Sequence, residues 1–158
     1  MSSVAAGVIR EEAAAKYRIY TTNLDCPTSE RNQLINITAE VNAVVARSGI
    51  RNGTVHIQSL HTTTALMLNE WQDALVYDIR TLFSQIVLRD SDWRHNDERY
   101  SDCDRKNADS HLRGMLLGQT MTLQVRNTAI LLGTWQQLIL VEFDGPRSRS
   151  LSVQVAGI

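Results

Sequence analysis

The stretch from Leu131 to Arg149 constrains the fold most, because an apolar run ends there in a turn crowded with charge. Residues 136–143 are predicted to form a buried strand, and the only Gly-Pro pair of the chain, at 145–146, marks a break in regular structure. Four charged residues come directly after the apolar run at 138–141, which is too many for an ordinary core strand. They are Glu142, Asp144, Arg147 and Arg149. We interpret this strand as one whose end delivers polar groups into a site, and the alternative is a surface turn whose charges are solvated.

Short runs with strand patterning extend along the chain, and helical patterns lie between them. Apolar residues of strand length mark the strands, which are predicted at 16–22, 33–37, 54–60, 120–125, 129–132, 136–143 and 150–155. Apolar residues three and four apart mark the helices, which are predicted at 39–47, from 69 or 70 to 85, and at 111–117. The last four strands are joined by short turns, which predicts an antiparallel meander. The 158 residues are therefore expected to form one α+β domain with a largely antiparallel or mixed sheet and two to three helices.

The second predicted helix carries Asp78 on its apolar stripe, three residues after Leu75 and four before Leu82. An unpaired buried carboxylate is costly, so Asp78 is expected to have a partner. Asp78 and Glu70, at the start of the same helix, are candidates to orient a histidine or to accept a proton.

Composition argues against several classes of partner. A net charge of −1 shows no bias toward nucleic acid or an anionic membrane. No apolar run approaches the roughly 20 residues that cross a bilayer. Cys26 and Cys103 belong to no CxxC pair, which favours a reducing compartment such as the cytoplasm. Residues 1–15 are Ala-rich but interrupted by charge, which is typical of a short helix or a loose arm and not of a secretion signal.

Three of the four histidines fall where a side chain can project into a cleft. His61 ends a predicted strand, His95 lies in the polar segment 89–107, and His111 falls in the first turn of a predicted helix. Three imidazoles with one open position suit zinc or a similar metal. No HExxH motif is present, so three unrelated histidines are the alternative. His56 has the opposite strand parity to His61 and is predicted to be structural.

Other polar residues suggest anion binding. Arg147 and Arg149 are candidates to bind phosphate or carboxylate, because the guanidinium fork fits such oxyanions; solvated strand-end arginines are the alternative. The hydroxyls of Thr62–Thr64 lie beside His61 as possible hydrogen-bond donors, although such a run is also an ordinary strand end. The polar segment 89–107 is long for a structureless connection, which predicts either a functional or a disordered loop.

Several motifs occur in one order along the chain. They are HTTTA at 61–65 leading to Asn69-Glu70, then Asp78, His95, Ser110-His111-Leu112, Gly118, LGTWQ at 132–136 and EFDGPRSR at 142–149. In this order and spacing the chain resembles the YjbQ-like family, also named the secondary thiamine-phosphate synthase enzyme family, from residue 17 to its last residue. The GTWQ and EFDGPR blocks carry most of the specificity.

The resemblance implies a YjbQ-like α+β domain at residues 16–158, with an extra arm at 1–15, assembled as a compact homotrimer with sites near the subunit boundaries. It also implies that His61, His95 and His111 converge on a divalent metal, zinc or magnesium. Catalytic roles are then expected for Glu70, Asp78, Arg147 and Arg149. Substrate contacts are expected for Thr62, Thr64, Trp135 and Gln136, of which Trp135 offers a stacking surface.

The expected function is a metal-assisted reaction on a small phosphorylated metabolite. The family name makes thiamine-phosphate synthase activity the candidate, in which a hydroxymethylpyrimidine diphosphate joins a thiazole phosphate and pyrophosphate leaves. A metal ion and arginines would stabilise the charge on the leaving oxygens. The alternatives are a metal-dependent phosphoester hydrolase and a non-enzymatic trimeric protein that binds an anionic metabolite.

Overall fold

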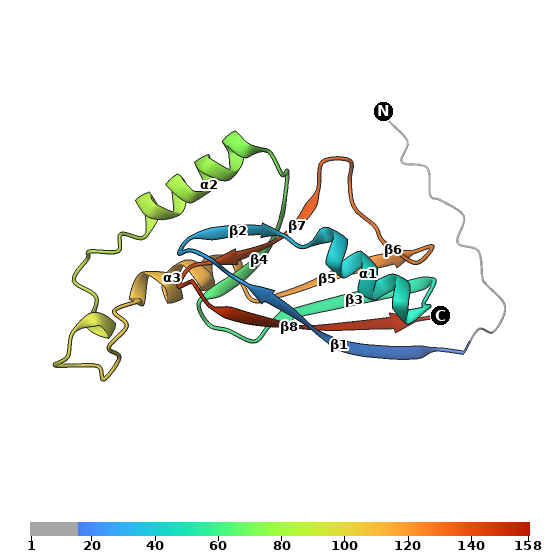
Figure 1. Ribbon diagram of the computed structural model, residues 1–158, viewed down its shortest axis with the longest axis horizontal. Coiled ribbons are helices and arrows are strands. Elements are labelled where there is room, and N and C mark those ends of the chain that lie inside the picture. The colour runs from blue at the N-terminus through green and yellow to red at the C-terminus, as the bar shows by residue number, and fades with distance from the viewer. Residues whose placement is uncertain (1–15) are drawn as a thin grey trace, which may run out of the picture.

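The computed structural model describes residues 16–158, and the predicted arm at 1–15 lies outside this range. Two sheets and several helices build the described part of the chain (Figure 1). The strands are β1 (Arg18–Pro27), β2 (Gln33–Asn36), β3 (Asn52–Ser59), β4 (Thr64–Asn69), β5 (Thr120–Arg126), β6 (Ala129–Ile130), β7 (Gln137–Glu142) and β8 (Ser148–Gly157). The helices are α1 (Thr38–Ser48), α2 (Asp73–Ile86), the 3-10 helix η1 (Arg94–Asn96) and α3 (Ala108–Leu117). Between residues 16 and 158, no helix is long and apolar enough to cross a membrane.

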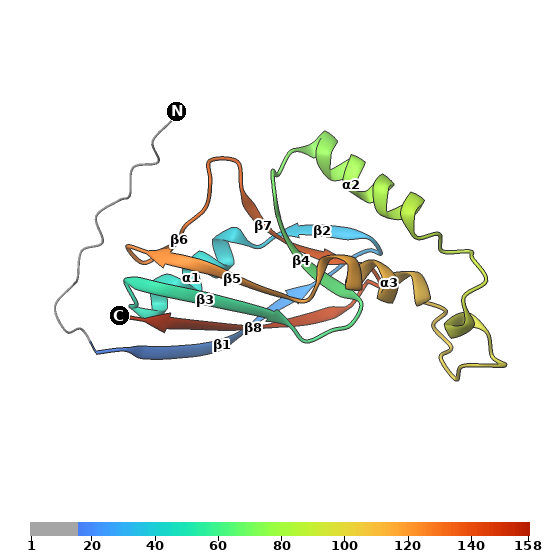
Figure 2. The same cartoon turned by 180° about the vertical axis from the view of Figure 1, so that it is seen from behind.

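All strand pairs in the described chain are antiparallel, which confirms the predicted α+β class. A five-stranded sheet has the order β1-β8-β3-β5-β6, and a three-stranded sheet has the order β2-β7-β4. Within the larger sheet, β8 pairs with β1 on one side and with β3 on the other. Seen from behind, α3 lies beside β4, at the end of the molecule from which the polar segment 89–107 extends (Figure 2).

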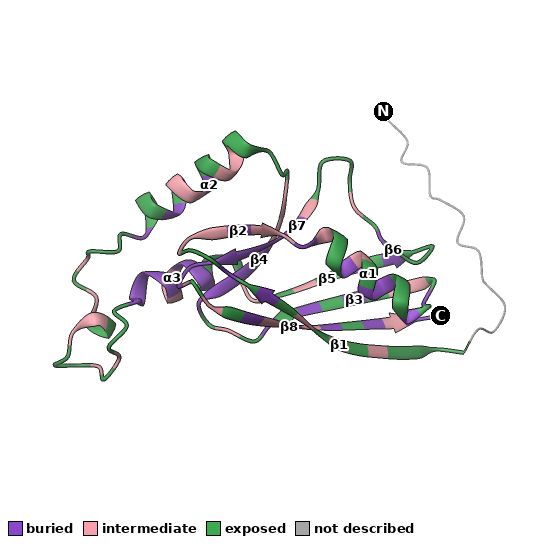
Figure 3. Ribbon diagram, in the orientation of Figure 1, coloured by how far each residue is buried: buried purple, intermediate pink, exposed green. Residues whose placement is uncertain are grey.

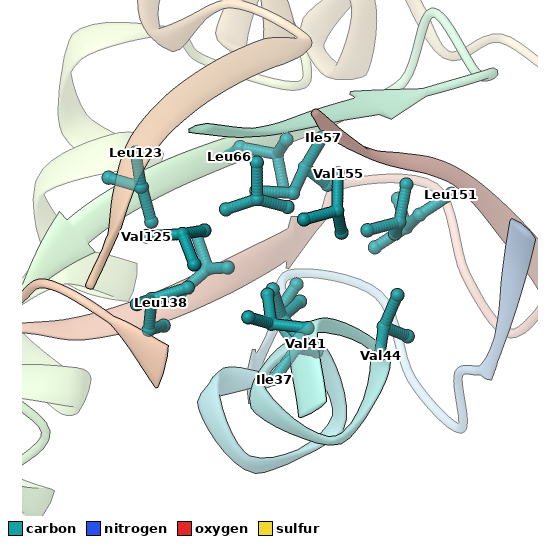
Figure 4. Close-up of a cluster of buried hydrophobic side chains, with 14 of the residues drawn as sticks. Ile37, Val41, Val44, Ile57, Leu66, Leu123, Val125, Leu138, Leu151 and Val155 are labelled. Atoms are coloured by element: carbon teal, nitrogen blue, oxygen red, sulfur yellow. The ribbon is translucent and has the colours of Figure 1, made fainter. Parts of the chain in front are cut away.

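Helix α1 packs its apolar face into the main core and leaves its other face exposed. Its apolar residues Val41, Val44 and Val45 are three and four apart and fully buried. They pack with Leu138 of β7 and with side chains of the larger sheet (Figure 4). The helix ends at Gly49, whose φ of 65° is the left-handed conformation that glycine adopts without strain. The predicted helix at 39–47 is therefore confirmed to within a residue at each end.

Strand β7 is buried on both faces because it separates two cores. Leu138 and Leu140 point into the main core, whereas Ile139 and Val141 point into a smaller one. Helix α2 covers the smaller core, where the Phe83 ring meets the Phe143 ring edge-on at a centroid distance of 5.2 Å. The continuous apolar run that marks this strand in the sequence follows from burial on two sides.

The apolar face of α2 differs from the predicted one. Its buried residues are Ile79 and Phe83, with Leu75 and Val76 partly buried, and Asp78 is exposed. The prediction that Asp78 lies on the buried stripe is therefore wrong. The predicted start at residue 69 or 70 is also wrong, because the apolar residues before it belong to β4 and the helix begins only at Asp73.

The predicted four-strand meander is wrong beyond its first hairpin. Strands β5 and β6 pair, but β7 joins the smaller sheet and β8 inserts between β1 and β3. Short linking turns favour sequential pairing, but β7 is apolar on both faces and therefore needs cover on both sides. A place in the middle of the smaller sheet, between the two cores, supplies that cover.

Candidate functional site

An open pocket of about 310 Å³ lies at one end of the smaller sheet, where four segments meet. These segments are the turn after β3, the end of the polar segment 89–107, the first turn of α3, and the turn between β7 and β8. The lining residues are His61, Thr62, Thr63, Arg105, Asn107, His111, Asp144, Arg147, Ser148 and Arg149. The end of β7 thus delivers polar groups into a recess, as the sequence predicted.

A buried ion pair between Glu142 and Arg149 forms the floor of this region. The Arg149 guanidinium donates from Nε and Nη2 to the two carboxylate oxygens of Glu142, at 2.5 and 2.6 Å. The Thr28 hydroxyl and the Asp144 backbone N–H also donate to this carboxylate, at 3.2 and 2.7 Å. Arg149 donates further to the Thr63 hydroxyl at 3.0 Å. Because the pair satisfies both partners bidentately, Arg149 acts in this structure mainly to hold the two strand ends together.

Several cationic side chains surround the Asp144 carboxylate at the pocket wall. Its Oδ2 accepts hydrogen bonds from Arg105 Nε and Asn107 Nδ2, both at 2.9 Å. The guanidinium groups of Arg31 and Arg147 lie 3.4 and 3.9 Å from the same carboxylate. Asp144 is only 3% exposed, so it fixes the positions of side chains that themselves reach solvent.

A second buried carboxylate, Asp109 in α3, extends this network away from the pocket. Arg31 Nη2 lies 2.9 Å from Asp109 Oδ1 and donates also to the Ser110 hydroxyl at 2.9 Å. Arg113 Nη1 lies 3.2 Å from Asp109 Oδ2, within ion-pair range but without the direction of a hydrogen bond. Burial lowers the pKa of Arg113, and Asp109 opposes that shift.

Together these groups form a positively charged cluster, which we call the arginine cluster. Within the described residues it joins three carboxylates, those of Asp109, Glu142 and Asp144, to five guanidinium groups, and so carries two positive charges in excess. The five are Arg31, Arg105, Arg113, Arg147 and Arg149. The Arg105 and Arg147 side chains are 42% and 36% exposed, so the excess charge reaches the pocket through these two. A half-enclosed wall of this kind attracts small anions.

His61 is held as a neutral ring at the pocket edge. Its Nε2 accepts a hydrogen bond from the Ser150 backbone N–H at 2.9 Å, so the neutral ring carries its proton on Nδ1. Burial and, to a smaller extent, the Arg149 guanidinium lower the pKa of His61. The Nδ1–H group is therefore available as a hydrogen-bond donor near neutral pH.

The His111 and His95 rings lie next to each other. Their centroids are 5.0 Å apart with the ring planes nearly perpendicular. His111 lines the pocket, whereas the exposed His95 lines a neighbouring recess together with His111. Burial, followed by the effect of His95, lowers the pKa of His111. Two half-buried imidazoles, His61 and His111, are thus neutral where the arginine cluster meets solvent.

These lowered pKa values predict that the fold is less stable in mild acid. Between the lowered pKa values and the ordinary value of 6.5, the unfolded chain binds more protons at His61 and His111 than the folded chain. Stability is then fully present above pH 6.5 and is lost as the pH falls through that window. Thermal unfolding followed from pH 7.5 to 5 is expected to show a falling midpoint.

A matched pair of variants isolates the contribution of His61. His61→Gln keeps an acceptor for Ser150 and removes the titrating ring, so its midpoint is expected to fall less steeply with acid. His56→Gln replaces an exposed histidine of β3 and is expected to keep the wild-type slope. A wild-type midpoint that stays constant or rises on acidification contradicts the assignment of neutral rings.

The three predicted metal ligands do not fit a shared metal centre in this arrangement. Within residues 16–158, no three His, Cys, Asp or Glu side chains lie close enough to hold a metal ion. His61 also uses its Nε2 lone pair to accept the Ser150 N–H, so that atom is not free as a ligand. Zinc or magnesium binding stays a prediction, which elemental analysis of the purified protein decides.

Other predicted site residues lie in or near the pocket. Thr62 lines it and is exposed, and Arg147 lines it with part of its guanidinium in solvent. Thr64 is fully buried and shares a hydrogen bond of 2.5 Å with the Ser59 hydroxyl, so within this chain it faces the core. Its neighbour Thr63 lines the pocket together with Thr62 and accepts a hydrogen bond from Arg149.

The remaining predicted residues lie elsewhere on the chain. Thr64 pairs with Glu142 at the pocket end of the smaller sheet, whereas Asn69 pairs with Gln137 at the opposite end. Glu70, Trp135 and Gln136 follow or precede this opposite end, roughly 20 Å away at the usual rise of a strand. One copy of the chain therefore does not bring these three, or the exposed Asp78 of α2, into the pocket.

Residues that the sequence reasoning missed supply much of the pocket wall. Arg105 and Asn107 end a polar segment whose composition does not distinguish them from their neighbours. Arg31 lies in a turn 78 residues before Asp109, so nothing local announces the pair. The one usable signal was in α3, where Asp109 and Arg113 are four residues apart and thus share a helix face.

Comparison with known sequences gives consistent matches. A model of the family described as "UPF0047 protein YjbQ-like" matches residues 22–158. A UPF0047 protein of Methanothermobacter thermautotrophicus is 42% identical over 139 residues, covering 88% of this chain and 93% of that protein. The UPF0047 protein YugU of Bacillus subtilis is 32% identical over 135 residues, covering 85% and 97%.

Solved structures match over the same range. A YbjQ-like protein of unknown function from Sulfolobus solfataricus P2 is 33% identical and superposes with a TM-score of 0.83, covering 90% of this chain and 99% of that chain. A hypothetical protein from Aeropyrum pernix K1 is 29% identical with a TM-score of 0.80, covering 88% and 99%.

Proposed function

The chain belongs to the YjbQ-like UPF0047 family, and on this premise we propose that its pocket binds a small phosphorylated metabolite. The observation that carries the proposal is the excess positive charge of the arginine cluster, presented to the pocket by Arg105 and Arg147. A guanidinium group matches the geometry of phosphate oxygens and stays charged at any physiological pH. Asp144 accepts a hydrogen bond from Arg105 and lies 3.9 Å from Arg147, so the Arg105 guanidinium needs to gain little order on binding.

The neutral histidines suit a reaction at this phosphate. When a diphosphate leaves, its carbon–oxygen bond breaks and the electron pair passes to the leaving oxygens, where negative charge builds up. Arg105 and Arg147 are placed to stabilise that charge, and the Nδ1–H of His61 can donate a hydrogen bond to the same oxygens. Thiamine-phosphate synthase activity is the candidate reaction that fits this chemistry.

The Arg147→Ala variant is expected to bind pyrophosphate about 10- to 100-fold more weakly, because a hydrogen bond to a charged group contributes about 1.5–3 kcal/mol. Isothermal titration of the full chain with pyrophosphate measures the effect. Arg126→Ala removes an exposed arginine at the end of β5 and is expected to leave the affinity unchanged. Thermal unfolding first shows that both proteins are folded. Equal pyrophosphate affinities of the wild type and Arg147→Ala then overturn the proposal.

Turnover assays separate the candidate activities. Pyrophosphate release from hydroxymethylpyrimidine diphosphate plus thiazole phosphate supports the synthase reaction. Phosphate release from a panel of phosphoesters supports a hydrolase instead, and tight anion binding without turnover supports a binding protein. Each assay is run with and without zinc and magnesium, so that a metal requirement is detected independently of the structure.

We propose in addition that the protein works as a homotrimer. Helix α2 is exposed along much of its length (Figure 3). Exposed apolar side chains on α2 and α3 include Tyr77, Leu82 and Met115, which are 70%, 52% and 68% exposed. Exposed large apolar side chains of this kind support an interface between copies of the chain. Light scattering tests this, and a monomeric mass at micromolar concentration contradicts it.

The cytoplasmic location expected from the sequence is kept as part of the proposal. Its support is that both cysteines, Cys26 and Cys103, are free thiols in the described chain.

A further inference from the structure

A second recess adjoins the pocket and differs from it in chemistry. It has a volume of about 330 Å³ and is lined by Trp93, Arg94, His95, Ala108, His111 and Leu112. We call it the ring recess. Its walls are mainly an indole ring, two imidazole rings and short apolar groups, whereas the pocket is lined by arginines, hydroxyls and amides.

His111 joins the two spaces, because its side chain lines both of them. The two spaces are also neighbours along the chain, because Asn107 lines the pocket and the next residue, Ala108, lines the ring recess. The two spaces therefore meet at His111.

The ring recess has fixed aromatic walls. The Trp93 indole N–H donates to the Leu88 backbone carbonyl at 2.8 Å, which holds the ring in place. The His95 and His111 rings meet edge to face, the geometry that aromatic rings prefer among themselves. Arg94 lies over the Tyr100 ring at 5.2 Å, so its charge has an aromatic partner outside the recess.

The charges around the pocket and the ring recess determine how a ligand that occupies both is oriented. Beyond Trp93, a further depression is lined by Asp92 and by the ion pairs of Asp97 with Arg99 and of Glu98 with Lys106, so its opposite charges largely compensate one another. The excess positive charge of the arginine cluster attracts a phosphate, so a ligand that occupies both spaces has its phosphate end in the pocket and its uncharged end in the ring recess.

We propose that the ring recess binds a flat aromatic or heteroaromatic ring of the same ligand, so that the substrate class is a phosphorylated aromatic compound. This inference rests on the proposed function, since the phosphate must occupy the pocket. Trp93 and Leu112 are then the specificity-determining residues, while Arg105 and Arg147 supply affinity for any phosphate.

The test compares phenyl phosphate with methyl phosphate, which carry the same charge and differ in the ring. The full chain is expected to bind phenyl phosphate about tenfold more tightly, as a few favourable aromatic contacts provide. Trp93→Ala and Leu112→Asn are expected to abolish the preference with little change for methyl phosphate. Arg147→Ala is expected to weaken both ligands by the same factor and to keep the preference.

Tyr17→Ala is the matched control, because it removes an exposed aromatic side chain that lines neither the pocket nor the ring recess. It is expected to keep both affinities and their ratio. Equal binding of the two phosphates by wild type, or an unchanged preference in folded Trp93→Ala and Leu112→Asn, overturns the ring recess and leaves the proposed function standing. Failure of both phosphates to bind overturns the proposed function and this inference with it.

Discussion

The Glu142→Ala variant is expected to lose about 3–5 kcal/mol of unfolding free energy, because it leaves a buried charge without its partner. The Arg149 side chain is 5% exposed and its two donor contacts to Glu142 are its main compensation for burial. The backbone N–H of Asp144 and the Thr28 hydroxyl lose their acceptor at the same time. For a domain of this size, such a loss corresponds to a fall of about 6–20 °C in the thermal midpoint.

Chemical denaturation measures this effect, and two further variants identify its cause. Glu98→Ala removes a glutamate whose side chain is 88% exposed, and its change is expected to stay within about 0.5 kcal/mol. The double variant Glu142→Met with Arg149→Met removes both charges and is expected to recover much of the loss, since buried ion pairs exchange for apolar residues at low cost. A stable Glu142→Ala single variant shows that Arg149 reaches solvent or another anion.

The Asp109→Ala variant is expected to destabilise the fold by about 3–5 kcal/mol for a related reason. Asp109 is fully buried and lies between two guanidinium groups, those of Arg31 and Arg113. Without it, the burial that already lowers the pKa of Arg113 has no opposing charge, and two cations face each other. Asp109 also lies in the first turn of α3, where a carboxylate interacts favourably with the helix dipole.

Asp78→Ala is the matched control, since Asp78 is an aspartate in a helix but is exposed. Its unfolding free energy is expected to change by no more than about 0.5 kcal/mol. Denaturant titration of both variants gives the comparison directly. Equal losses for the two aspartates contradict the burial assigned to them here.

Local patterns in the sequence predicted much of the fold. Helix α1 and its glycine end were correctly placed, because their signals come from neighbouring residues. The strand predicted at 54–60 was also confirmed as β3, in which Val55, Ile57 and Ser59 are buried and His56 and Gln58 are exposed. The pairing of β8 with β1 was not predictable, because the paired residues of these two strands lie more than a hundred positions apart in the sequence.

The candidate site was likewise predictable only in part. The charged turn after β7 was recognised from composition, and Asp144, Arg147 and Arg149 line the pocket; their role in a functional site stays a prediction. Which arginine is buried and which reaches solvent was not predictable, because that depends on Glu142 meeting Arg149 across the turn. For His61, the hydrogen bond to Ser150 is a contact between residues 89 positions apart, so no spacing rule could reveal it.

The interior position of β8 has a consequence for synthesis on the ribosome. Gly157 pairs with residues of both β1 and β3, so these strands have no neighbour between them until β8 itself emerges. The nascent polypeptide then presents two unsatisfied edges, which are ready templates for unwanted pairing with other chains. Since β8 also carries Arg149, the pocket can assemble only after translation has passed the whole sheet.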